Sequence, residues 1–218
     1  MSRHLLMVVL CIALLAAALS VAQGAPSFRG YTGLVIIPTA DALDDGEYNF
    51  GVMTEDTGEF DANDLFANYG VANGLEIGFN SSQASPRETL INAKYLFMRE
   101  TEERAGVAFG IIDLTDERQS TAYLVASKSL VRGLNVFDRE ITNLRGHIGL
   151  GGGRLNSLFC GVSGFVGNRM MFSVEWDSRD TNLGFRFTPF RTVRLHAALF
   201  DLGGSSDLGL GISFNKTY

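Results

Sequence analysis

Two histidines are the side chains best suited to acid–base chemistry in this sequence. His147 and His196 are the histidines that follow His4, and each lies in a stretch where polar and apolar residues alternate. A barrel enzyme that modifies lipid would pair one of them with a serine and a carboxylate near the lipid-facing rim. Histidines that face a polar interior are more often hydrogen-bonded structural residues. A lipid-modifying enzyme is therefore an alternative, and neither histidine is predicted to be catalytic.

Other catalytic and cofactor motifs are missing from the sequence. It contains no phosphate-binding loop, no nucleophile elbow and no spacing typical of a metal site. Its two cysteines are Cys11 and Cys160, and Cys11 lies in an N-terminal stretch that we expect to be removed. One thiol then remains, which excludes an intramolecular disulfide. We predict no catalytic residue, no metal and no cofactor.

Alternation between apolar and polar residues organises most of the chain. In residues 208–215, leucine, isoleucine and phenylalanine occupy one parity, while glycine, serine and asparagine occupy the other. A period of two is the signature of a strand with two different faces. The same pattern recurs in residues 48–53, 75–80, 91–97, 106–111, 144–150, 172–177, 183–188 and 193–199.

Glycines indicate which face is enclosed. Gly184, Gly209 and Gly211 lie on the polar face of their strands, as Arg186 and Arg194 do. Glycine weakens a strand, so a solvated surface gives no reason to place it there. A confined interior does give a reason, because long charged side chains need room. We therefore predict that the charged parity faces a polar lumen.

Charges on this parity are expected to form a structural network. If adjacent strands pair, Glu76 and Lys94 share the inner face, and Glu175 lies opposite or diagonal to Arg186, with Arg194 on the next strand. Such cross-strand pairs contribute roughly 0.2 to 1 kcal/mol each. The predicted lumen-lining network consists of Glu76, Lys94, Arg145, His147, Glu175, Arg186, Arg194 and His196.

The fold class follows from these faces. We predict an all-β protein, a single antiparallel β-barrel of roughly ten to twelve strands and of outer-membrane type, with lipid outside. Residues 134–143 are the least regular stretch and are expected to form a long loop. Alternation alone also fits a sandwich. A soluble periplasmic barrel or sandwich that binds an apolar ligand, with the apolar parity inside, is thus a second alternative.

Aromatic residues mark the ends of several predicted strands. Tyr95, Phe97, Trp176, Phe187 and Tyr218 lie on the apolar parity. Aromatic girdles at both interfaces are typical of membrane barrels. A terminal strand that ends in an aromatic residue also resembles the signal by which barrels are recognised for assembly.

The N-terminus is predicted to direct export. Arg3 precedes the uncharged stretch 5–22, and small residues end it, so we expect a signal peptide over residues 1–22 with cleavage after Ala22. Residues 26–218 are then one barrel domain. No later stretch approaches the ~20 apolar residues of a membrane helix, so membrane residence would come from strands.

Net charge and cysteine content indicate where the protein is located and which partners it has. The sequence has 18 basic and 24 acidic residues, a net charge of −6, and losing Arg3 leaves 17 and 24, or −7. An acidic chain without basic runs argues against nucleic acid as a partner. A single remaining thiol is unusual for a secreted eukaryotic domain. We expect the bacterial outer membrane, with outer-membrane lipid and the barrel assembly machinery as partners.

Several short motifs occur in an order that resembles the YjbH-like outer-membrane β-barrel proteins. They are TGLVIIPTA at 32–40, DGEY at 45–48, NAKY at 92–95, GGGR at 151–154, LFCG at 158–161 and NLGFR at 182–186. That family is associated with exopolysaccharide production or export, and its typical members are longer. The resemblance implies a non-enzymatic structural or transport-associated envelope component, with polysaccharide as a candidate ligand.

Overall fold

Twelve strands form the protein in its computed structural model, which describes residues 24–56, 61–82, 88–136, 139–167, 169–204 and 206–216. The expected signal peptide lies outside these ranges. The strands are β1 (Tyr48–Asp56), β2 (Asp61–Ala72), β3 (Leu75–Ser82), β4 (Glu88–Met98), β5 (Gly106–Ile112), β6 (Thr121–Val136), β7 (Arg139–Gly151), β8 (Ser157–Val166), β9 (Met170–Trp176), β10 (Thr181–Phe190), β11 (Val193–Leu199) and β12 (Leu208–Lys216). A short 3₁₀ helix, η1 (Gly153–Leu155), separates β7 from β8.

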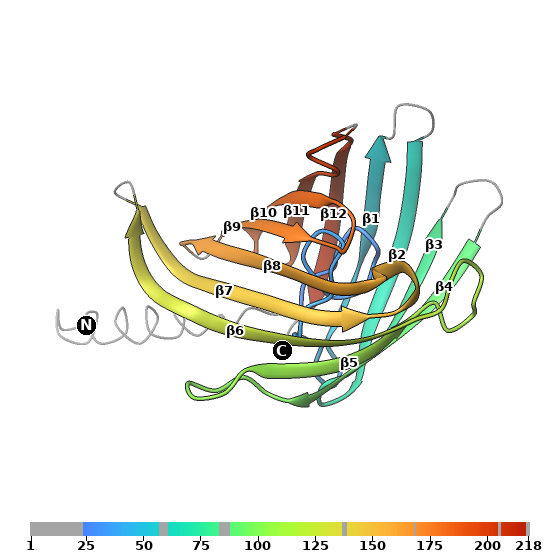
Figure 1. The fold of residues 1–218 in the computed structure, drawn as a ribbon, viewed down its shortest axis with the longest axis horizontal. Helices are drawn as coiled ribbons and strands as arrows, with labels where there is room; N and C mark the ends of the chain where they lie inside the picture. The colour runs from blue at the N-terminus through green and yellow to red at the C-terminus, as the bar shows by residue number, and fades with distance from the viewer. Residues whose placement is uncertain are drawn as a thin grey trace, which may run out of the picture.

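The strands close into an antiparallel barrel. Each strand pairs with its neighbours in the chain, and β1 pairs with β12 so that Tyr48 is opposite Lys216. Figure 1 shows the strands curving around a central space, with the long β6–β7 hairpin sweeping to one side. This confirms the predicted all-β single barrel, at the upper end of the expected strand number. Within the described ranges, no helix is long and apolar enough to cross a bilayer.

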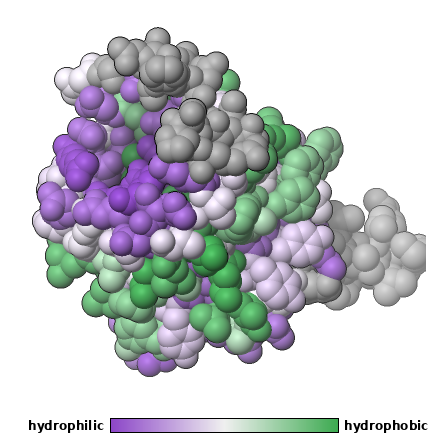
Figure 2. Space-filling view, turned by 90° about the vertical axis from the view of Figure 1, so that its right-hand side faces the viewer, coloured by the Kyte–Doolittle hydropathy of each residue, from purple (hydrophilic) through white to green (hydrophobic). Residues whose placement is uncertain are grey.

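Apolar side chains cover the outside of the barrel. Leu65, Ile77, Ile148 and Leu210 are each between 44 % and 54 % exposed, and they share the predicted apolar parity. On the face in Figure 2, hydrophobic residues gather below and to the right of a hydrophilic region, so the two kinds of surface are separated. This arrangement is the one expected of a barrel with lipid outside. It is opposite to that of a soluble barrel with an apolar interior.

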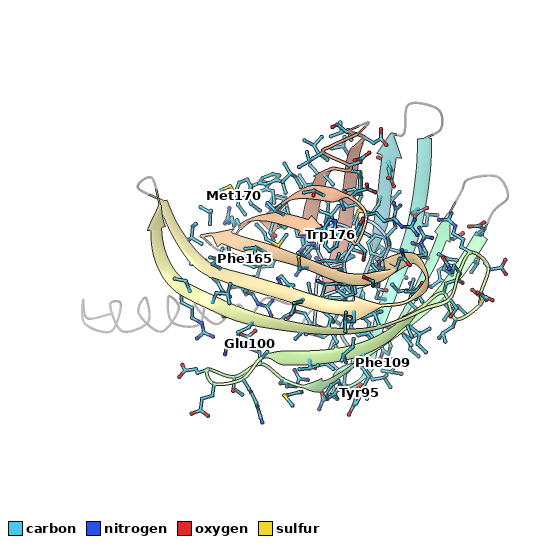
Figure 3. All side chains as sticks on the ribbon, in the orientation of Figure 1. Tyr95, Glu100, Phe109, Phe165, Met170 and Trp176 are labelled. Carbon is cyan, nitrogen blue, oxygen red and sulfur yellow. The ribbon has the colours of Figure 1, made fainter. Side chains whose placement is uncertain are left out.

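The predicted girdle residues point outward where the structure describes them. Tyr95, Phe97 and Trp176 are 50 %, 49 % and 38 % exposed, and Phe187 is half-buried. Tyr95 lies opposite Phe109 on the neighbouring strand, and both are labelled in Figure 3. Tyr218 lies outside the described residues.

The loop predicted at residues 134–143 is wrong. Strand β6 extends to Val136 and β7 begins at Arg139, and Leu134 pairs with Ile141. A register shift between Ser129 and Val131 explains the error. One extra residue in a strand exchanges its two faces, so the polarity pattern no longer keeps one phase along this stretch.

Candidate functional site

The lumen of the barrel is occupied by residues 24–47, which we call the lumenal segment. This segment has turns and isolated bridges in place of a strand, and most of its residues are buried. In Figure 1 it is the blue chain inside the ring of strands. Its polar atoms bond to side chains on opposite walls, including Asn68 on β2, Ser127 on β6 and Arg186 on β10.

All eight predicted lumen-lining residues are buried, with exposed fractions of 8 % or less. They are Glu76, Lys94, Arg145, His147, Glu175, Arg186, Arg194 and His196. Most of their hydrogen bonds, however, reach the lumenal segment or neutral side chains. The interior network is therefore organised around the segment, which the sequence did not predict.

Glu175 holds the middle of the lumenal segment. Its carboxylate accepts hydrogen bonds from the backbone N–H groups of Val35, Ile36 and Ile37 at 2.9, 2.6 and 3.2 Å. Asn182 donates to the same carboxylate at 3.3 Å. Three successive N–H groups that converge on one anion form a backbone anion site. Here the anion belongs to the barrel wall, so it fixes the segment to β9.

Glu76 and Lys94 hold the segment on the other side of the lumen. They lie opposite each other on β3 and β4, as the shared inner face predicted. Glu76 accepts hydrogen bonds from the backbone N–H groups of Thr32 and Leu43 at 3.2 and 3.0 Å. Lys94 donates to the carbonyl oxygens of Thr32 and Asp41. Residues on both sides of positions 35–37 are thus tied to one pair of strands.

Arg145 forms two ion pairs inside the barrel. Its guanidinium binds both carboxylate oxygens of Asp41 at 2.8 and 3.0 Å, and one of its nitrogens also bonds to Glu100 at 3.0 Å. Bidentate pairs of this kind are among the stronger charge-assisted hydrogen bonds. Asp41 belongs to the lumenal segment, so this pair is a third point of attachment.

The predicted network of Glu175, Arg186 and Arg194 is wrong in its pairing. Glu175 on β9 lies opposite Asn182 on β10. The residue opposite Arg186 is Met171, which is four positions from Glu175 along β9. Four positions along a strand span about 13 Å. Arg186 donates instead to two carbonyls of the segment, and Arg194 donates to Asn215 at 2.6 Å.

Both histidines are bonded to serines. His147 contacts the hydroxyls of Ser127 and Ser163 at 2.8 and 3.0 Å. His196 contacts Ser213 at 2.8 Å and accepts a hydrogen bond from Arg186. No carboxylate among the described residues bonds to either ring. In the part of the chain that the structure describes, each histidine thus has a serine partner without the carboxylate that the enzyme alternative would pair with it.

Apolar packing fills the remaining space of the lumen. Leu34 and Ile37 pack with wall residues such as Phe159, and Phe28 and Val35 pack in a second cluster. A cavity of about 20 Å³ remains between the segment and the wall, which is the size of one water site. The segment therefore fills much of the described lumen.

A larger hollow lies outside the lumen. Its volume is about 570 Å³, and outward-facing residues of β6–β9, among them Ile148, Val162 and Val174, line it. Ser127, His147 and Glu175, whose side chains are buried, also border this hollow from the strands.

The β5–β6 loop is organised by one carboxylate. Asp113 accepts hydrogen bonds from the hydroxyl of Thr115 and from the backbone N–H groups of Glu117, Arg118 and Gln119, at 2.8 to 3.1 Å. Burial alone would raise the pKa of Asp113, but these hydrogen bonds hold it below its ordinary value. A lowered folded-state pKa stabilises the loop above the unfolded-state value of about 3.9.

We expect this loop to loosen in acid. As the pH falls through the folded-state pKa of Asp113, protonation removes its acceptor role, so protection of amides 117–119 should fall by about ten-fold, as for the loss of one such bond. Hydrogen exchange, corrected for intrinsic rates, measures this. The Asp113→Asn variant should already show this low protection of amides 117–119 at neutral pH. If the unmodified protein shows the same protection in acid and at neutral pH, Asp113 does not organise the loop.

Comparison with known proteins is informative about the fold. The KdgM porin matches with a TM-score of 0.50 and 11 % identity over 79 % of this chain and 99 % of that chain. A structure of KdgM porin in complex with disordered oligogalacturonate matches with a TM-score of 0.52 and 12 % identity, over 78 % and 99 %. No protein-family model and no curated protein matches the sequence. The chain thus has the fold of a porin, a closed antiparallel barrel of outer-membrane type.

Proposed function

We propose that this protein is a non-enzymatic outer-membrane barrel, associated with transport, whose passage is closed by its own N-terminal segment. The observation that carries the proposal is the lumenal segment, residues 24–47, bonded to charged residues on opposite walls of the lumen. The apolar outer face supports residence in a bilayer. Outer-membrane lipid and the barrel assembly machinery are its proposed partners.

The width of the barrel favours a transport role over a purely structural one. Barrels of about eight strands are filled by their own side chains, while those of sixteen or more leave a channel. A twelve-stranded barrel lies between these sizes. Its lumen needs a filler to be closed, and here the filler is a chain segment held by noncovalent bonds, which can in principle be displaced.

The resemblance to YjbH-like proteins gives the proposal its cellular setting. Residues 32–40 carry the first motif of that resemblance, and they form the centre of the lumenal segment. On this basis we propose a link to exopolysaccharide export, with polysaccharide as a candidate ligand. Loss of the gene product without any change in exopolysaccharide output would refute this link.

The intact protein is expected to be membrane-integral and nearly non-conducting. It should resist a carbonate wash, change its gel mobility on boiling and give currents close to baseline in planar bilayers, because the segment fills the lumen. Release by carbonate would refute the outer-membrane assignment. Large, stable conductance steps from the intact chain would refute closure by the segment.

A further inference from the structure

Three buried cations surround one residue of the lumenal segment. Lys94, Arg145 and Arg186, which we call the cationic ring, are 2 %, 5 % and 8 % exposed. Arg145 binds the carboxylate of Asp41, and Lys94 donates to its carbonyl oxygen at 3.1 Å. Asp41, Arg145 and Arg186 also line the same cavity of about 20 Å³. Three strands, β4, β7 and β10, thus present positive charge to one position in the lumen.

The members of the ring differ in how they are neutralised. Arg186 bonds to carbonyl oxygens of Pro26 and Gly33, to a sulfur atom and to a histidine ring, all of them neutral acceptors. Lys94 faces Glu76 across the β3–β4 pair. Arg145 bonds to Glu100 as well as to Asp41. Asp41 is therefore the only carboxylate of the lumenal segment that bonds to the ring.

Charge balance changes when the segment leaves. Counted with Arg194, the other wall cation that acts on Arg186, four cations face three wall carboxylates, Glu76, Glu100 and Glu175, so a net charge of +1 would remain without Asp41. Breaking a buried ion pair leaves a costly unpaired charge. The vacated ring would therefore attract an anion from solution, and a pore with charged rings selects ions by their sign.

We propose that the cationic ring is an anion site of the transport path, and that Asp41 occupies it in the closed state in place of a carboxylate-bearing solute. This inference rests on the proposed function, because it requires that the segment can leave the lumen. The substrate class would be solutes with carboxylate groups. The fork of Arg145 supplies the matching geometry, since guanidinium groups bind carboxylates in a bidentate manner.

Reversal potentials of an opened variant test the sign of the selectivity. In a chain that lacks residues 25–43, chloride should permeate more readily than potassium by roughly five-fold, the preference that about one unit charge at 4 Å produces in water. Adding Arg145→Gln or Arg186→Gln should reduce this ratio toward one. The matched control Arg191→Gln, at an exposed turn, should leave it unchanged.

A second test uses the full-length chain and needs no open pore. Asp41→Ala vacates the ring, so acetate should raise the melting temperature of this variant by about 2–4 °C over chloride at equal ionic strength. The double variant Asp41→Ala with Arg145→Gln should show no such shift. This measurement also decides the inference if the deletion variant fails to fold.

The outcomes separate the inference from the proposed function. An open deletion variant that prefers chloride supports both. An open variant that prefers potassium, or has no preference, overturns the anion site and leaves closure by the segment standing. A folded deletion variant that remains closed overturns the proposed function. The melting temperature of Asp41→Ala in acetate then decides the anion site: a rise over chloride supports it, and no rise overturns it.

Discussion

Deleting residues 25–43 is expected to raise the single-channel conductance by roughly ten-fold or more, because a barrel of this width without a filler leaves a passage. The deletion removes the apolar packing of Leu34 and Ile37 and the bonds that the segment makes to Glu175 and Lys94. Residues 44–47, which join the segment to β1, are retained so that the first strand keeps its connection. Planar-bilayer recording measures the change.

A deletion elsewhere provides the control for this experiment. Removing the exposed residues 202–204 of the β11–β12 connection shortens the chain without touching the lumenal segment. That variant should stay closed. Equal conductance in the two deletion variants would mean that the segment does not close the pore.

Replacing Glu175 is expected to give the largest single-residue effect on stability. Glu175 is 1 % exposed and accepts three backbone N–H bonds from residues 35–37. Glutamine keeps one acceptor oxygen and turns an NH₂ group toward the same donors. We expect Glu175→Gln to lower the free energy of unfolding by roughly 3–5 kcal/mol, the usual cost of breaking a buried charged network.

The midpoint of unfolding in detergent, followed by gel mobility, measures this loss. Glu103→Gln, at an exposed position of the β4–β5 turn, is the matched control and should be neutral. A Glu175→Gln midpoint equal to that of the control would contradict the role of this carboxylate. Brief openings in bilayer recordings should accompany the loss, since the segment loses its bonds to β9.

The two faces of the strands could be predicted because alternation is a local property. Successive residues of a strand face lipid and lumen in turn. The outward position of Leu210 and the inward position of Ser213 could therefore be predicted without knowing the partner strand. Burial of the eight lumen-lining residues followed from the same alternation. Where a register shift intervenes, as between Ser129 and Val131, the local pattern changes phase and the prediction failed.

Pairing inside the lumen could not be read from the sequence. Glu76 and Lys94 were placed opposite each other correctly, because a simple hairpin sets their register. Glu175 and Arg186 were not, because their register depends on where the turn after Trp176 ends. Sequence spacing gives the side of the sheet, while contact also needs the offset between strands.

The lumenal segment was missed because its partners lie far away in the chain. The bonds between Glu175 and residues 35–37 span almost 140 positions. One signal was present: residues 33–38 form a continuous apolar run that ends in proline. A strand between lipid and a polar lumen should alternate, so an unbroken apolar run was evidence against a strand of the barrel wall.

A disulfide between the segment and the wall tests the central claim most directly. The side chain of Val35 lies against Gly184, where an added Cβ would be 2.7 Å from a Val35 methyl carbon and would also meet the Ser173 hydroxyl. Ser173→Ala is therefore added to both cysteine substitutions, to give a disulfide at this position room. In a Cys160→Ser background, Val35→Cys with Gly184→Cys should cross-link in native membranes and keep the bilayer current at baseline. Two free thiols after mild oxidation, in a correctly inserted barrel, would show that the segment does not occupy the lumen.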